Sequence, residues 1–354
     1  MSGNKEFTHS GLKHGGRIKA AAEKYNIPEE DWLDLSTGLN PNGWSVSNVP
    51  ASIWQTLPED NDGLQTAACK YYGCDYCLPV SGSQAAIQIF PSLRSFSKVG
   101  VISPTYAEHE YNWKQAGHDV VQISLADVEN KINELDVLVV INPNNPTGEI
   151  VSSEKLLKWH QQLSTKGGWL IVDEAFMDVT PENSLLPTGI KPGLIVLRSL
   201  GKFFGLAGIR SGFVITDKEL LQRLADKLGP WSLSGPSRYI AKQALQDKSW
   251  HEKSVKELKQ ASERLKELLT ENDLAPEGGT ALFQWLSHAH ANELFEAFAQ
   301  QGILVRYFEE GMPTLRFGLP ANEEQWQRLN NALNLLSSLK ETLEKNNESE
   351  LSHV

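Results

Sequence analysis

The sequence predicts an α/β fold in which helices flank a largely parallel central sheet, with a second, smaller α/β domain. Short apolar runs have the character of buried strands, and amphipathic stretches such as 152–167 separate several of them. This alternation is typical of a parallel sheet, because helical crossovers connect its strands. The runs lie at 98–103, 119–124, 136–142, 168–176, 193–200 and 211–216. The last follows its predecessor after a short link, so an antiparallel neighbour is expected there.

The pattern changes after about residue 235. Residues 237–272 read as one or two long amphipathic helices, followed by strands within 278–287 and 302–320 and a closing helix over 322–345. We therefore predict four parts: an N-terminal arm (1–45) that contributes to the substrate site and the small domain, a large domain (46–235), a connecting helix with a small C-terminal domain (236–345), and a polar tail (346–354).

Composition narrows the class of partner. The 354 residues are 40% hydrophobic and 22% charged, as in an ordinary soluble globular protein. The net charge of −11 argues against nucleic acid or an anionic membrane as the main partner. No apolar run approaches the roughly 20 residues of a membrane span, and the N-terminus lacks the apolar core of a secretory signal. We expect a cytoplasmic protein whose small-molecule substrate can still be an anion.

The chain has three cysteines, Cys69, Cys74 and Cys77. They are too few for a disulfide framework. Cys74 and Cys77 form a lone CxxC, with no second Cys or His pair at zinc-site spacing. We therefore expect no metal site and a structural role for these residues.

Lys202 stands in an unusual place for a lysine. It follows the predicted strand 193–200 and lies among glycines and phenylalanines in the stretch SLGKFFGLAGIRSGF. Burial in such surroundings lowers the pKa of an amine and makes it nucleophilic. The sequence thus indicates a lysine placed for chemistry, such as formation of a Schiff base, rather than for solvation.

Other polar residues are predicted at the same edge of the sheet, where ligands bind beyond the carboxyl ends of parallel strands. Taken singly, Asp173 could be a turn or cap residue, NPNNPTG a tight turn and Tyr106 a core aromatic. Taken together they fit pyridoxal phosphate, which needs an anion cradle, an aromatic face, an amide, a carboxylate for its ring nitrogen and a desolvated lysine. The predicted cofactor residues are Gly82, Ser83, Gln84, Tyr106, Asn145, Asp173, Ser199, Lys202 and Arg210.

These motifs, in the order Tyr106, NPNNPTG, DEAF, SLGK, GIRSGF and LRFG, resemble the class I/II aminotransferases, which are fold-type I pyridoxal-phosphate enzymes. The resemblance implies that Lys202 holds the cofactor covalently, Asp173 pairs with its ring nitrogen and Asn145 binds its phenolic oxygen. It also implies that Ser199 and Arg210 bind the phosphate and Arg316 binds a substrate carboxylate. The family usually has tyrosine where this chain has Phe176.

Homodimers are usual in this family, and the partner subunit often supplies a tyrosine to the cofactor phosphate. Residues 52–65, where such a tyrosine is expected, contain none, and Tyr71 and Tyr72 belong to the next predicted helix. We expect a homodimer in which that contact is absent or made differently.

The stretch 14–43, with HGG and STGLNPNG, is similar to the start of threonine-phosphate decarboxylases of cobalamin biosynthesis, which are relatives of histidinol-phosphate aminotransferase. This likeness implies decarboxylation of O-phospho-L-threonine to (R)-1-amino-2-propanol phosphate. The implied substrate residues are His14, Gly15, Asn40, Asn145, Arg306 and Arg316.

Other interpretations stay open. The HGG segment could be a flexible arm without a ligand, and Arg306 could pair with Glu309 or Glu310. The enzyme could instead be histidinol-phosphate aminotransferase or a related transaminase. A non-catalytic regulator with this fold is disfavoured, because Lys202, Asp173 and Arg316 are intact and no DNA-binding module is expected in the short N-terminus.

Overall fold

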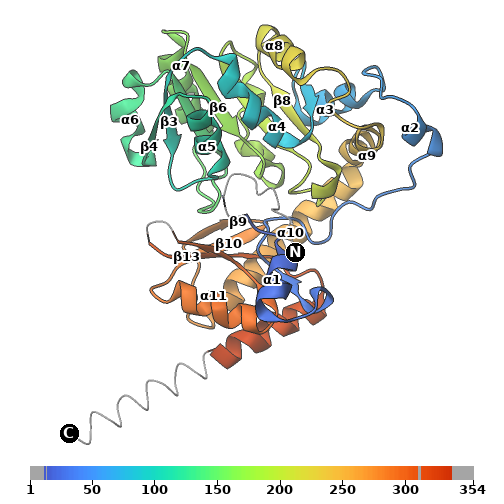
Figure 1. The fold of residues 1–354 in the computed structure, drawn as a ribbon, viewed down its shortest axis with the longest axis vertical. Helices are drawn as coiled ribbons and strands as arrows, with labels where there is room; N and C mark the ends of the chain where they lie inside the picture. The colour runs from blue at the N-terminus through green and yellow to red at the C-terminus, as the bar shows by residue number, and fades with distance from the viewer. Residues whose placement is uncertain (1–11, 13, 310–311, 337–354) are drawn as a thin grey trace, which may run out of the picture.

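The computed structural model describes residues 12, 14–309 and 312–336 of the chain, so the predicted tail at 346–354 lies outside the described residues. Figure 1 shows a larger lobe built on one sheet and a smaller lobe beneath it, with helix α10 (Lys248–Thr270) leading from the first into the second. Within the part of the chain that is described, no helix is long and apolar enough to cross a membrane.

The larger lobe contains a seven-stranded mixed sheet. Its strands, in spatial order, are β2 (Leu78–Val80), β8 (Gly212–Ile215), β7 (Leu194–Ser199), β6 (Trp169–Asp173), β5 (Val137–Ile141), β3 (Lys98–Ile102) and β4 (Asp119–Ile123). Strands β7, β6, β5, β3 and β4 are parallel, whereas β8 is antiparallel to both β7 and β2. The predicted strands and the antiparallel neighbour are confirmed.

Strands at the centre of this sheet are apolar throughout because both faces are covered. Val137 and Val139 of β5 join one core cluster with Trp113, while Leu138 and Val140 join the cluster on the other face with Trp159. Strand β4 differs. We predicted a buried strand there, but it lies at the edge of the sheet and most of it is half-buried or exposed, in keeping with the polar residues in DVVQIS.

Helices cover the two faces and the β2 end of this sheet. They are α2 (Ala51–Gln55), α3 (Leu64–Tyr72), α4 (Gly82–Ile89), α5 (Glu108–Gln115), α6 (Val128–Lys131), α7 (Ser153–Ser164), α8 (Lys218–Leu228) and α9 (Gly235–Gln246). Helix α9 packs against α3 and α2, and α10 begins shortly after it, at Lys248, with the side chain of Asp247 as its N-cap. The long amphipathic stretch therefore forms two helices, and the first of them packs with the larger lobe.

The smaller lobe contains a four-stranded antiparallel sheet in the order β12 (Arg306–Phe308), β13 (Thr314–Gly318), β10 (Phe283–Ser287) and β9 (Gly278–Thr280). Helices α10, α11 (Ala291–Gln300) and the helical residues 323–336 surround it. A short parallel pair joins β1 (Leu33–Asp34) to β11 (Ile303–Leu304), and α1 (Ile18–Tyr25) contacts α11. The N-terminal segment thus packs on the smaller lobe.

From there the chain passes directly beneath the Lys202 loop. The Asn40 and Trp44 amides donate to the Lys202 and Phe204 carbonyls at 3.0 and 2.9 Å. A Cβ atom on Gly43 would lie 2.7 Å from the Phe204 carbonyl oxygen, so only glycine allows this approach. The STGLNPNG segment therefore supports the loop that presents Lys202.

Candidate active site

Lys202 lies just beyond the end of β7, on a loop fixed by its two phenylalanines. Phe203 and Phe204 are buried, and Phe204 stacks on Trp250 of α10 at 5.5 Å between ring centroids. Tyr71 of α3 meets Phe204 edge-on at 5.6 Å. The two phenylalanines after Lys202 thus anchor a short connection between both lobes.

The surroundings of the Lys202 amine lower its pKa. Its pKa is lowered to about 8, mainly by burial and also by the nearby Arg316 and Arg210, while Asp173 acts in the opposite direction. The Nζ atom also lies 5.1 Å from the centre of the Phe176 ring. An amine with this pKa supplies the neutral, nucleophilic form near physiological pH.

Asp173 ends β6 and is 4% exposed. One carboxylate oxygen accepts the Ala175 amide at 3.1 Å, and the other lies 3.1 Å from Nε2 of His109, which is buried on α5. Sequence reasoning missed His109. Its position three residues after Tyr106, one helical turn on, was the available signal, and its ring meets Tyr106 edge-on at 6.4 Å.

An anion cradle forms where α4 begins. Gly82 has φ +71°, and a Cβ atom there would come within 2.8 Å of an Arg210 nitrogen. A Cβ on Gly212 would lie 2.6 Å from the Ser83 amide nitrogen. The glycines thus bring the N-terminus of α4 and the Arg210 guanidinium together, which is the arrangement that binds phosphate. Ser199, at the end of β7, accepts the Gly201 amide at 3.2 Å.

The side chain of Gln84 is hydrogen-bonded to two other side chains of the protein. Its carbonyl accepts the Tyr106 hydroxyl at 3.2 Å, and its amide donates to Glu108 at 2.8 Å. The other Glu108 oxygen lies 2.9 Å from Nε2 of His14. Burial raises the pKa of Tyr106, with the Glu108 charge adding to the shift, so this phenol stays protonated. Gln84 therefore positions Tyr106, and Glu108 ties the N-terminal segment to α5.

Only one asparagine of NPNNPTG faces the site. Asn142 exchanges two hydrogen bonds with the Val151 backbone, at 2.8 and 3.0 Å, and Asn144 bonds to Thr105. These two asparagines stabilise the conformation of the NPNNPTG loop. Asn145 accepts a hydrogen bond from Arg316 instead, which brings the NPNNPTG loop of the larger lobe to the smaller sheet.

A cluster of guanidinium groups lies on that smaller sheet. Arg306 and Arg316 are directly paired across β12 and β13, so their side chains project from the same face. The pKa of Arg316 is lowered to about 9, mainly by burial and also by the charge of Arg306. Burial and the nearby Arg17 lower the pKa of Arg306. Sequence reasoning missed Arg17, although it directly follows HGG. Cations held this close favour an anionic ligand.

Comparison with known proteins identifies the family to which this chain belongs. Residues 51–333 match the model of "Aminotransferase class I and II". The chain belongs to that family. It is 52% identical to a threonine-phosphate decarboxylase of Pseudomonas aeruginosa, over 91% of this chain and 97% of the relative. It is 38% identical to one from Sinorhizobium sp., with the same shares covered. The crystal structure of a histidinol-phosphate aminotransferase from Clostridium acetobutylicum superposes with a TM-score of 0.76 at 26% identity, covering 86% of this chain and 99% of that one.

Pyridoxal phosphate is the cofactor of this family, and the residues described here fit it. The cradle at Gly82 and Arg210 suits its phosphate, Asp173 suits its protonated ring nitrogen, and the amine of Lys202 suits its aldehyde. Arg316 gives independent support for an anion at this site. Its Nε atom is buried without a hydrogen-bond partner among the described residues, while its other nitrogens donate to Asn145 and the Ser36 carbonyl.

Three predicted residues have surroundings that the sequence did not reveal. The Asn40 amide nitrogen donates to the Phe203 carbonyl and to Ser254, and its oxygen accepts the Asn42 amide. In this structure the Asn40 side chain therefore supports the Lys202 loop. Gly15 packs so tightly that a Cβ would lie 2.5 Å from the Ser36 carbonyl oxygen. Phe176, where the family usually has tyrosine, packs edge-on against Phe283 and offers no hydroxyl.

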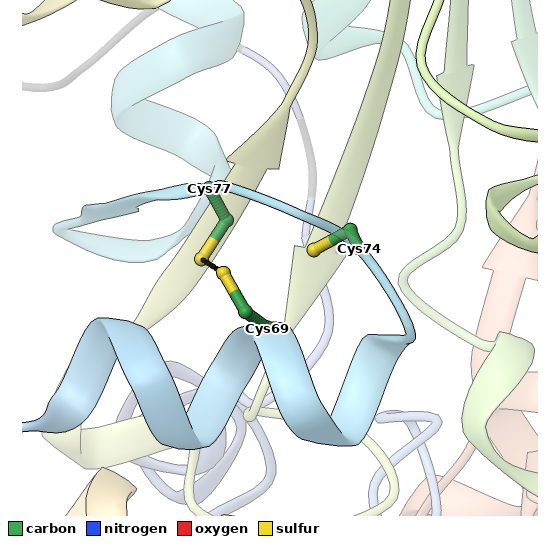
Figure 2. Close-up of side chains that lie close together, drawn as sticks. All are labelled: Cys69, Cys74 and Cys77. Carbon is green, nitrogen blue, oxygen red and sulfur yellow. Dashed lines mark hydrogen bonds between the residues drawn. The ribbon is translucent and has the colours of Figure 1, made fainter.

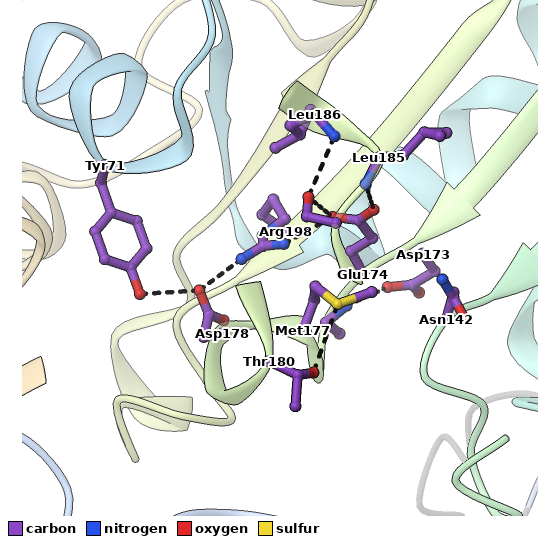
Figure 3. Close-up of polar contacts among 12 residues, drawn as sticks. Tyr71, Asn142, Asp173, Glu174, Met177, Asp178, Thr180, Leu185, Leu186 and Arg198 are labelled. Carbon is purple, nitrogen blue, oxygen red and sulfur yellow. Dashed lines mark hydrogen bonds and ion pairs between the residues drawn. The ribbon is translucent and has the colours of Figure 1, made fainter. Parts of the chain in front are cut away.

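Behind the site lies a buried ionic network (Figure 3). Asp173 and Glu174 are consecutive, yet Asp173 faces the site while Glu174 turns toward Arg198. The Arg198 guanidinium donates to Glu174 and Asp178, each at 2.7 Å, and all three side chains are at most 3% exposed. Tyr71 donates to Asp178 at 3.1 Å. This tyrosine is thus engaged within its own chain.

Proposed function

We propose that this protein decarboxylates O-phospho-L-threonine to (R)-1-amino-2-propanol phosphate and carbon dioxide, in the supply of the aminopropanol linker of cobalamin. The observation that carries the proposal is the 52% identity to the Pseudomonas aeruginosa threonine-phosphate decarboxylase over nearly the whole of both chains. The guanidinium cluster supports it, because a phosphorylated amino acid carries two anionic groups and needs more than one cation.

Within this proposal, pyridoxal phosphate would act as the electron sink when bound. Lys202 would hold it and, once released, return a proton to the substrate Cα from its Nζ atom, a role suited to a pKa of about 8. Asp173, fixed by His109 and the Ala175 amide, would keep the ring nitrogen protonated. Arg316 and Arg306 would bind the substrate's anionic groups, and His14 and Gly15 would contribute to the same site, since Gly15 packs against the Ser36 carbonyl to which Arg316 donates.

The experiment that tests the proposal is a decarboxylation assay on the protein loaded with cofactor. O-phospho-L-threonine is supplied without an oxo acid, and carbon dioxide is followed over many turnovers. Sustained release supports the decarboxylase, because a transaminase without an oxo acid stops after one half-reaction. Absence of release from the active, cofactor-loaded protein contradicts it.

The second candidate is histidinol-phosphate aminotransferase. It is favoured by the solved Clostridium acetobutylicum structure, which covers 86% of this chain at 26% identity. It would use the same lysine and the same phosphate cradle. Conversion of the cofactor to its amine form by histidinol phosphate, without carbon dioxide release from phosphothreonine, would establish this activity instead.

We further propose a cytoplasmic homodimer. Large apolar side chains are exposed on the segment around α2 that projects from the larger lobe in Figure 1, including Val46, Trp54 and Leu57 at 55%, 67% and 64%. Such a patch fits a second copy of the chain. A monomer in light scattering at micromolar concentration would contradict the dimer. We also propose a domain boundary near Asp247, between α9 and α10.

A further inference from the structure

The three cysteines, which the reaction does not use, lie together beside α3. Cys69 is in the last turn of α3, Cys74 follows its C-terminal Gly73, and Cys77 directly precedes β2. Figure 2 shows the Cys69 and Cys77 sulfurs facing each other, with the Cys74 sulfur turned toward both. All three sulfur atoms lie within 4.8 Å of one another. The fold thus adds Cys69 to a CxxC that stood alone in the sequence.

The sulfur spacing matches tetrahedral metal coordination. The Cys69 and Cys77 sulfurs are 3.7 Å apart. A zinc–sulfur bond of about 2.3 Å in tetrahedral geometry places two sulfurs about 3.8 Å apart. A disulfide would require these atoms to close to about 2.0 Å. Binding of zinc therefore requires less movement of these two sulfur atoms than formation of a disulfide does.

Backbone contacts already hold the cysteines in place. The Cys74 amide donates to the Cys69 carbonyl at 3.0 Å, and the Gln65 side chain donates to the Cys77 carbonyl. Cys77 is buried, whereas Cys69 and Cys74 are partly accessible, so an ion can enter from solvent and keep a water as its fourth ligand.

We propose that Cys69, Cys74 and Cys77 form a thiolate site for one zinc ion that fastens the end of α3 to the start of β2. Three thiols lose three protons as Zn²⁺ binds, and water completes the tetrahedron. Because β2 leads directly to the phosphate cradle at Gly82, the ion would stabilise that side of the larger lobe. The site is independent of which reaction the enzyme catalyses.

The test measures zinc on the full-length, cofactor-loaded protein. Reduced protein is treated with chelator, incubated with zinc sulfate and gel-filtered. We expect one zinc per wild-type chain, background zinc in Cys74→Ser and in the triple serine variant, and a zinc-dependent rise in Tm that only the wild type shows. Asp75→Asn, an exposed change between Cys74 and Cys77, is the matched control and should keep the ion.

A second measurement needs no variant to fold. Cobalt(II) bound to the wild type should give the intense d–d bands of tetrahedral thiolate ligation in the red part of the spectrum, where the cofactor does not absorb. Zinc retention equal to that of the triple serine variant would overturn the proposal. Formation of a Cys69–Cys77 disulfide in air by protein that retains no zinc would also overturn it, and would indicate a redox pair instead.

Discussion

Two basic side chains stand four positions apart at the end of β7, Arg198 buried and Lys202 half-buried, and their surroundings are opposite. Arg198 donates to two buried carboxylates, which raise its pKa although burial acts to lower it. Lys202 has other cations nearby, and burial lowers its pKa to about 8. The first arrangement fixes a charge and holds structure together. The second destabilises a charge and so makes an amine reactive. The same strand end thus supports both stability and chemistry.

The largest expected effect comes from removing the reactive amine. Lys202→Ala should lower turnover about 10³-fold or more and abolish the yellow colour of the covalently bound cofactor. Thermal unfolding of the cofactor-free protein should change little, because the amine makes no hydrogen bond or ion pair with the described residues. Carbon dioxide release, absorbance and Tm check these outcomes. A reducible yellow chromophore that persists in the variant would contradict the assignment of Lys202.

Removing the paired cation, Arg198, should reduce stability rather than cofactor binding. Arg198→Met leaves Glu174 and Asp178 buried without their partner and should lower the free energy of unfolding by about 3–5 kcal/mol. Folded protein should still bind cofactor. Denaturant unfolding measures the loss, with Arg264→Met as control, because the Arg264–Glu323 pair is exposed. Equal stability losses in the two variants would show that burial of the network is unimportant.

Arg316 links the two effects, since it lowers the pKa of Lys202 and is the arginine that we propose binds a substrate carboxylate. Arg316→Gln should lower kcat/KM roughly 10- to 150-fold, the value of a hydrogen bond to a charged group of about 1.5–3 kcal/mol. Steady-state kinetics with O-phospho-L-threonine check this. Unchanged kcat/KM would remove Arg316 from the substrate site.

The same variant tests the pH dependence. A lowered pKa means that Lys202 is protonated below about pH 8 and neutral above it. Uptake of pyridoxal phosphate by the cofactor-free protein should therefore accelerate as pH rises through about 8 and then level off. In Arg316→Gln the midpoint should move to higher pH, because one source of the lowered pKa is lost. Stopped-flow absorbance measures both midpoints, and a shift to lower pH would refute this electrostatic account.

The smallest effect is expected at Tyr71, which lies at the edge of the buried network around Arg198. Tyr71→Phe removes the hydrogen bond to Asp178 and should cost about 1 kcal/mol of unfolding free energy. Cofactor affinity should stay unchanged, because Tyr71 is engaged within its own chain. Equilibrium unfolding and cofactor titration test the two halves. Weakened cofactor binding without loss of stability would instead assign Tyr71 to the phosphate site.

Much of the site was predictable because its residues follow strand ends. Lys202 and Asp173 each follow an apolar run, and parallel strands carry such positions to one edge. His109 was missed, because a histidine on a helix becomes a partner of Asp173 only when the fold brings the start of α5 to the end of β6. The role of Asn40 was equally hidden. The sequence motif shows that residue 40 is an asparagine, whereas the packing of the Lys202 loop determines which groups the Asn40 side-chain amide binds.

By itself, the sequence determined most strands of the central sheet, the long helices, the family and a lysine that we assign to the cofactor, because these depend on patterns within a few residues. Tertiary structure alone decided that Glu174 faces Arg198 while Asp173 faces the site, that Arg306 and Arg316 lie in register, and that Cys69 joins Cys74 and Cys77. The physical reason is that electrostatic and coordination chemistry depends on distances of a few ångströms. Such distances are set by packing between segments that local patterns do not place relative to one another.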